Sequence, residues 1–299
     1  MKITLSTYSL RNEWKDFIKD KPEALMVICK DLGFDEIELI DFTTDTLEAI
    51  VAKLTANGVK VFGIATGLTY LVKPEEVAQT LKEGEQLIRL AHKCKIKYIR
   101  GFVGNGPLPP VFAPMEDFEE EEWAEYNEQI QQAAELSGAI LDPLLKLAEE
   151  LDVYLGIETH HGYSSNYIYM QEINKRFTSK HLGWIFDVGN YENDEMRWKA
   201  LEEVKNRVFY VHAKMYQFDE KGFETTLDYP KVHKTLKEAG FDGKWSIEFE
   251  GKMNGLYGTI KSQELLKYCI AQGIGDKYSI NVNIPTGQEL IEKYNKLMK

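Results

Sequence analysis

The sequence has little of what disulfide-stapled, membrane-spanning or nucleic-acid-binding proteins need. The 299 residues include only three cysteines, Cys29, Cys94 and Cys269. This number argues against a disulfide framework and against a thiolate metal site. No apolar run approaches the roughly 20 residues of a membrane span. The formal net charge of −12 is opposite in sign to the basic surface that neutralises phosphates, so neither a nucleic acid nor a membrane is an expected partner.

The N-terminus lacks the long apolar core and the small-residue cleavage site of a secretion signal. Residues 1–8 alternate apolar and polar side chains instead, which predicts a first strand. With 43% hydrophobic and 28% charged residues, the chain is expected to be a soluble globular protein. The shortage of cysteine fits a reducing compartment, and we expect a cytoplasmic location.

Short apolar runs alternate with longer amphipathic segments along the whole chain. The predicted strands are residues 3–8, 36–39, 60–65, 98–102, 154–158, 182–187, 208–213 and 245–249. The predicted helices are residues 22–32, 47–57, 74–93, 119–151, 167–177, 196–205, 229–239 and 262–271. Gly33, Gly58 and Gly240 each follow a predicted helix, where a left-handed residue ends it at low energetic cost. The glycine-rich stretch 251–259 is expected to be a loop and not a phosphate cradle.

Strict alternation of strand and helix predicts right-handed βαβ crossovers and a parallel sheet. An open sheet would need a glycine-rich phosphate loop after its first strand, and residues 8–12 contain no glycine. Eight units therefore predict an α/β fold, the (β/α)8 TIM barrel, as a single domain over residues 1–299. We expect a C-terminal extension from about residue 275, whose helix, residues 289–299, packs on the outside of the barrel or on a second subunit of a homo-oligomer.

Four successive predicted strands end in, or close to, a residue that can bind a metal: Glu158, Asp187, His212 and Glu248. Active sites of this fold lie at the C-terminal ends of the strands, so these side chains are expected to converge. Three carboxylates and one imidazole form a hard donor set that suits one divalent metal ion, Mn²⁺, Mg²⁺, Co²⁺ or Zn²⁺. Without an ion, three crowded carboxylates would repel one another.

The two-residue period of a strand extends this site by one layer. Lys214 is expected to hold a substrate oxygen or to pair with Glu250, and His160 to bind a substrate hydroxyl or to orient a ligand. Earlier strands offer Glu38 and Arg100 to the same site. The candidate substrate-binding residues are His160, Lys214, Glu250, Arg100, Trp14 and Asn190.

These strand ends resemble the xylose isomerase-like TIM barrels, a superfamily of sugar isomerases and epimerases that also includes endonuclease IV-type enzymes. The resemblance rests on Gly156-Ile157-Glu158-Thr159-His160, Phe186-Asp187-Val188-Gly189-Asn190, Val211-His212-Ala213-Lys214 and Ile247-Glu248-Phe249-Glu250-Gly251. It implies an enzyme of carbohydrate metabolism with one divalent metal held by those four ligands. It also implies that Glu158 and Glu248 are catalytic and move protons on opposite faces of a carbon next to a carbonyl. Metal polarisation of that carbonyl would acidify the C–H bond.

Endonuclease IV-type enzymes hold three zinc ions through further histidines, and this sequence departs from that pattern. The ends of its third and fourth strands, residues 65–67 and 100–102, contain no histidine, and Asn190 stands at a further ligand position. We therefore predict a metal-dependent isomerase or epimerase acting on a ketose, inosose or related polyol. The alternatives are a dehydratase using the same site, an endonuclease IV-like phosphodiesterase and a non-catalytic sugar-binding barrel.

Overall fold

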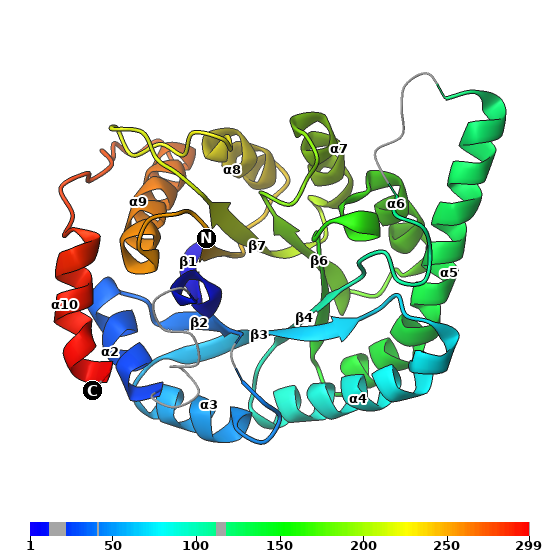
Figure 1. Ribbon diagram of the computed structural model, residues 1–299, viewed down its shortest axis with the longest axis horizontal. Coiled ribbons are helices and arrows are strands. Elements are labelled where there is room, and N and C mark those ends of the chain that lie inside the picture. Colours follow the sequence, from blue (N-terminus) through cyan, green and yellow to red (C-terminus); the bar gives the residue numbers. More distant parts are fainter. Residues whose placement is uncertain (12–21, 41, 112–117, 299) are drawn as a thin grey trace. The chain divides into compact units, whose positions relative to one another are not determined.

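The fold is described from a computed structural model that covers residues 1–11, 22–40, 42–111 and 118–298. Within these ranges, eight parallel strands follow one another in a closed order, β1 to β8, with helices between them. The chain is therefore a single (β/α)8 barrel, as predicted. Figure 1 shows the order of the elements along the chain by colour.

The predicted and observed elements agree closely. The strands are β1 (Lys2–Ser6), β2 (Glu36–Leu39), β3 (Lys60–Thr69), β4 (Tyr98–Phe102), β5 (Tyr154–Glu158), β6 (Leu182–Asp187), β7 (Val208–Met215) and β8 (Lys244–Phe249). The α-helices in the described ranges are α2 (Pro22–Leu32), α3 (Leu47–Ala56), α4 (Val77–Lys93), α5 (Glu120–Glu150), α6 (Tyr167–Arg176), α7 (Asp194–Val204), α8 (Tyr229–Glu238), α9 (Gly255–Gly273) and α10 (Gly287–Met298). Short 3₁₀ helices are η1 (Thr7–Leu10), η2 (Pro74–Glu76) and η3 (Gly162–Ser165).

Contacts divide the chain into two compact units, and the first contains residues 1–64 and 210–299. In this unit β1 pairs in parallel with both β2 and β8, so that Leu5 lies opposite Ile37 and Ile247. The last helix, α10, packs against α2 and α9 (Figure 1). The Tyr294 hydroxyl donates to Asp31 on α2 at 3.1 Å. The unit thus joins the first and last segments of the chain.

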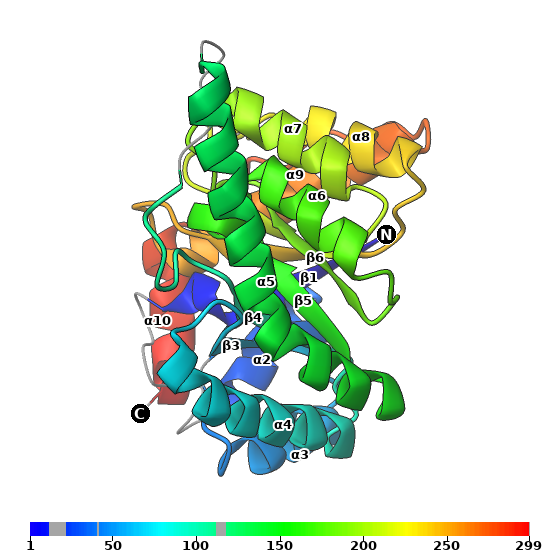
Figure 2. The ribbon, with the colours of Figure 1, turned by 90° about the vertical axis from the view of Figure 1, so that its right-hand side faces the viewer.

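The second unit contains residues 65–209. Its central strands, β4, β5 and β6, pair in parallel, with Leu155 opposite Ile99 and Leu182. The 31-residue helix α5 packs against α4 and α6, and Figure 2 shows its length. Buried apolar side chains such as Ile157 and Ile185 fill this unit and fix the ends of β5 and β6.

Glycine ends three helices as predicted, because Gly33, Gly58 and Gly240 have φ angles of 77°, 80° and 82°. Several predicted boundaries differ from the observed ones, and β3, for example, continues to Thr69 instead of ending at residue 65. The first strand stops at Ser6, since residues 7–10 form η1. Helix α9 begins at Gly255 and not at residue 262, because the Asn254 side chain accepts a hydrogen bond from the backbone N–H of Tyr257 and caps the helix. Much of the stretch predicted as a loop, residues 251–259, is therefore helical.

Within the described ranges, no helix combines the length and the apolar character that a membrane span requires.

Candidate metal centre

Two buried carboxylates end the neighbouring strands β5 and β6. Glu158 is the last residue of β5, and its Oε2 lies 3.1 Å from Nε of Arg100 on β4. Asp187 is the last residue of β6, and its Oδ1 accepts from the Gly189 N–H at 2.7 Å. The Asp187 N–H donates to Thr159 Oγ1 at 2.9 Å, which ties the two strand ends together. Both carboxylates are therefore held in fixed orientations.

Two further candidate ligands lie on β7 and β8. His212 and Glu248 are both buried, and His212 Nδ1 lies 3.5 Å from Glu248 Oε2. Lys214 lies opposite Glu248 in the strand register, with its Nζ 3.6 Å from Glu248 and 3.5 Å from Glu250. The predicted pairing of Lys214 with Glu250 is thus present. The ammonium group compensates part of the negative charge that the two glutamates bring to this strand end.

Glu38 on β2 holds the opposite side of the His212 ring. Its two carboxylate oxygens lie 3.0 and 2.9 Å from His212 Nε2. The same carboxylate accepts from the Tyr210 hydroxyl at 2.6 Å and from Ser246 Oγ at 3.3 Å. Because a carboxylate accepts hydrogen bonds, Nε2 carries a proton in this arrangement, and Nδ1 is the ring nitrogen that could ligate a metal ion.

The structure brings the four predicted ligands together. Each offers one ligand atom, and these four atoms lie within 4.8 Å of one another; the ligands are Glu158, Asp187, His212 and Glu248. Glu248 Oε2 is buried and makes no hydrogen bond within the described part of the chain. Lys214 Nζ, 3.6 Å from this oxygen, compensates only part of the negative charge that the three carboxylates bring together. Three carboxylates and one imidazole suit Mn²⁺, Mg²⁺, Co²⁺ or Zn²⁺, so the group could hold a divalent metal ion.

The other predicted site residues have different surroundings. The Arg100 guanidinium carbon lies 4.0 Å from the centroid of the Phe102 ring, and the His160 ring centroid lies 4.7 Å from the same ring. Arg100 is thus engaged with Glu158 on one side and with an aromatic face on the other. Trp14 lies outside the described residues. Whether these side chains contact a substrate stays a prediction.

Two tyrosines near the candidate ligands are kept in their protonated form. Burial raises the pKa of Tyr191, and the nearby Asp187 carboxylate raises it further. Burial also raises the pKa of Tyr8, with Glu250 adding to the effect. Both hydroxyls therefore remain hydrogen-bond donors at neutral pH.

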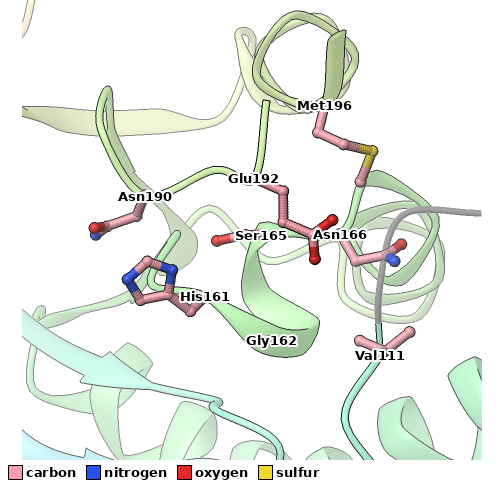
Figure 3. A pocket seen from close by; sticks show the side chains of 8 residues that line it. All are labelled: Val111, His161, Gly162, Ser165, Asn166, Asn190, Glu192 and Met196. Atoms are coloured by element: carbon pink, nitrogen blue, oxygen red, sulfur yellow. The ribbon is translucent and has the colours of Figure 1, made fainter. Parts of the chain in front are cut away.

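Asn190, the last predicted substrate-binding residue, lines a small cavity of about 60 Å³ beside η3. Figure 3 shows the residues around it: Val111, His161, Gly162, Ser165, Asn166, Asn190, Glu192 and Met196. Most of these residues carry no sequence pattern that predicts a role, because they lie on loops and helix starts whose positions no periodicity fixes.

Comparison with known proteins identifies the same architecture. A family model described as a xylose isomerase-like TIM barrel matches residues 27–269. Among solved structures, a D-tagatose 3-epimerase-like protein is 19% identical with a TM-score of 0.66, and the alignment covers 92% of this chain and 99% of that one. The IOLI protein with a bound zinc atom is 14% identical with a TM-score of 0.65, covering 91% and 99%. At these identities the structural likeness shows the fold.

One curated relative matches over a short segment. The C-glycoside deglycosidase alpha subunit of Arthrobacter globiformis is 37% identical over 49 residues. The match spans 16% of this chain and 14% of the relative's length.

Proposed function

We propose, from the premise that the chain belongs to the xylose isomerase-like TIM barrel family, that it is a divalent-metal-dependent isomerase or epimerase. Its substrate is a ketose, inosose or related polyol, and the reaction moves a proton next to the carbonyl. The observation that carries the proposal is the buried group formed by Glu158, Asp187, His212 and Glu248. The structural likeness to sugar-epimerase-type barrels supports it.

The metal, when bound, would polarise the carbonyl and the adjacent hydroxyl and so acidify the C–H bond between them. Glu158 and Glu248 then serve as the two proton carriers, one taking up a proton and the other returning one. Each has a cation beside it, Arg100 at 3.1 Å from Glu158 and Lys214 at 3.6 Å from Glu248. These cations stabilise the buried carboxylates before the proton is transferred.

The surrounding polar side chains would orient the substrate. Lys214 and Glu250 lie together beside Glu248 and can bind neighbouring oxygens of a polyol as donor and acceptor. His160 and Phe102 provide a ring surface at the end of β4 and β5, against which the C–H face of a sugar can pack. This mixture of charged groups and an aromatic face is suited to a small hydroxylated molecule.

Proton exchange in D₂O tests the function directly. The protein with Mn²⁺ is incubated with a panel of free ketoses and inososes, with and without chelator, and C–H signals are followed by NMR. We expect chelator-sensitive loss of one C–H resonance, which identifies both the substrate and the carbon. Exchange should fall roughly 10²- to 10⁴-fold in Glu158→Gln, the range for loss of a general base. The matched control is Glu202→Gln, at an exposed position on α7 where the carboxylate pairs with a surface lysine.

Full exchange in a Glu158→Gln variant that still binds metal would contradict the assignment of Glu158 as a proton carrier. Product masses identify a dehydratase, because only dehydration removes water. A phosphodiesterase of the endonuclease IV type would bind about three zinc ions per chain and cleave abasic DNA. Metal analysis that gives one ion per chain, with no cleavage, excludes that alternative.

A further inference from the structure

We propose that the small cavity of Figure 3, here called the η3 pocket, binds the hydroxyl-bearing end of an uncharged polyol. The pocket is defined by its lining residues: Val111, His161, Gly162, Ser165, Asn166, Asn190, Glu192 and Met196. The inference rests on the proposed function for the reaction itself. It adds the class of substrate: a sugar or polyol that carries no phosphate at the end that enters the pocket.

An unsatisfied hydroxyl points to a ligand in the η3 pocket. Ser165 is 8% exposed, and its Oγ is buried and has no hydrogen-bond partner in the described part of the chain. In Figure 3 this hydroxyl points into the space between His161 and Asn190. Leaving a buried hydroxyl without a partner is unfavourable, and a ligand hydroxyl can both donate to it and accept from it. The pocket therefore contains a preformed partner for a polar, neutral group.

The backbone around the pocket is held in an unusual conformation. His161 has a φ of 53°, which side-chain-bearing residues seldom adopt. Neighbouring hydrogen bonds fix this bend, since Tyr163 N–H donates to the Gly104 carbonyl at 3.2 Å and Ser164 Oγ accepts from His160 N–H at 3.0 Å. Strained backbone of this kind persists where the surroundings enforce it, and it is frequent at ligand sites. In Figure 3 the His161 ring lies on the side of the pocket formed by Asn190.

The pocket lies close to the candidate ligands along the chain. His161 is three residues beyond Glu158, and Asn190 is three residues beyond Asp187. Three residues span at most about 11 Å even when fully extended. A six-carbon polyol that reacts beside Glu158 and Asp187 can therefore place its far hydroxyls in the η3 pocket. The cavity of about 60 Å³ also has room for such a group, since one water needs roughly 10–15 Å³.

The charge of the pocket disfavours a phosphate. No lysine or arginine is among its described lining residues, and its one carboxylate belongs to Glu192. The helix N-termini nearby are already capped. The Asn166 side chain accepts from Ile168 N–H and Tyr169 N–H on α6, and Asn193 accepts from Met196 N–H on α7. A phosphate in the pocket would meet the Glu192 carboxylate, and no lysine or arginine of the described lining would offer it a charge-assisted hydrogen bond. Val111 and Met196, in contrast, offer apolar contact to the carbon skeleton of a polyol.

The test uses the full chain with Mn²⁺ and a panel of free ketoses and inososes together with the terminal monophosphate esters of the same ketoses. Binding is measured by saturation-transfer NMR, and turnover by proton exchange in D₂O. Ser165→Ala removes the unpartnered hydroxyl, and Glu192→Lys reverses the charge at the pocket. Glu195→Lys is the matched control, because Glu195 is an exposed residue of α7 that pairs with Lys199 at 2.6 Å and does not line the pocket.

We expect the wild type to bind free members of the panel in preference to their esters. Ser165→Ala should weaken that binding roughly three- to tenfold, the effect of losing one neutral hydrogen bond. Glu192→Lys should shift the preference toward the esters by about tenfold, while Glu195→Lys behaves as the wild type. Binding with these variant effects but without exchange would support the pocket and contradict the proposed proton transfer.

Three results would overturn the inference: preference of the wild type for phosphate esters, absence of binding to every panel member, or variants at Ser165 and Glu192 that both behave as the control. If proton exchange is faster with a phosphate ester than with the free sugar, the proposed reaction stands and the inference about the η3 pocket is contradicted. The two proposals therefore fail separately.

Discussion

At the scale of single residues, Glu38 decides how His212 can act. An imidazole can ligate a metal through either ring nitrogen. The hydrogen bond made by one nitrogen determines that the other nitrogen is the ligand. Glu38 occupies the Nε2 side at 2.9–3.0 Å and is itself held by Tyr210 and Ser246. Nδ1 is therefore the ring nitrogen that faces Glu248, and it lies 3.5 Å from Glu248 Oε2. The strand pattern placed Glu38 among the candidate site residues. It could not show that the Glu38 carboxylate contacts His212, which lies 174 positions away in the sequence.

Glu38→Gln should lower the affinity for a divalent ion about 10- to 100-fold, because an amide orients the imidazole less strongly than a charged carboxylate does. Titration with Co²⁺, followed by visible absorption or calorimetry, measures the change without any substrate. Glu36→Gln is the control on the same strand, since the Glu36 carboxylate pairs with Lys2, Lys60 and Lys244 instead. Equal affinities for the Glu38 variant and the wild type would show that His212 does not depend on this contact.

At the scale of elements, the sequence predicted the strands that matter most because each is a short apolar run between polar residues. Strands β5 and β6 have the predicted bounds, so the placement of Glu158 and Asp187 at strand ends was predicted correctly. The first turns of α9, which was predicted to begin at residue 262, and the whole of η3 were missed. Helix α9 starts in a glycine-rich stretch because Asn254 caps it, and η3 forms where His161 turns the backbone to a positive φ. Neither feature has a periodic pattern, so of the residues that line the η3 pocket only Asn190 was predicted for the site.

Gly183→Ala tests how tightly β6 is packed at its start. A Cβ at Gly183 would lie 2.6 Å from the Arg207 carbonyl oxygen and 2.6 Å from the Phe209 ring, so the strand or the neighbouring backbone must shift. The free energy of unfolding should fall by about 1–3 kcal/mol, the usual effect of overpacking. Gly67→Ala on β3 is the control, because nothing lies within 4 Å of its Cβ position. Urea unfolding curves that coincide for both variants would contradict the packing argument.

At the scale of the whole molecule, metal binding should stabilise the folded chain. The candidate ligands come from four strands, β5 to β8, so the complete set exists in the folded state and not in the unfolded chain. Binding to the folded state alone contributes about 2.7 kcal/mol at a metal concentration of 100 times the Kd. We expect Mn²⁺ to raise the Tm in a concentration-dependent way and a chelator to reverse the rise. A Glu248→Gln variant that shows the same rise in Tm would exclude Glu248 as a ligand.

His233 should make the stability depend on pH. It is 2% exposed on α8, and burial, assisted by the charge of Lys237, lowers its pKa to about 4. The unfolded chain binds the proton at a pKa of about 6.5, so the stability contributed by neutral His233 is complete above that pH. It is lost as the pH falls from about 6.5 to about 4. Urea unfolding across this range should show the decrease, and His233→Gln should reduce it.

The discontinuity of the first unit has a consequence for biosynthesis. Residues 1–64 are synthesised before residues 65–209, yet β1 pairs with β8, which begins at Lys244. At synthesis rates of about 5–20 residues per second, β1 waits roughly 10–50 s for that partner. The continuous segment 65–209 meets no such delay. Strand β1 therefore can pair with β2 early but acquires its second neighbour, β8, only after β2 to β7 have been synthesised.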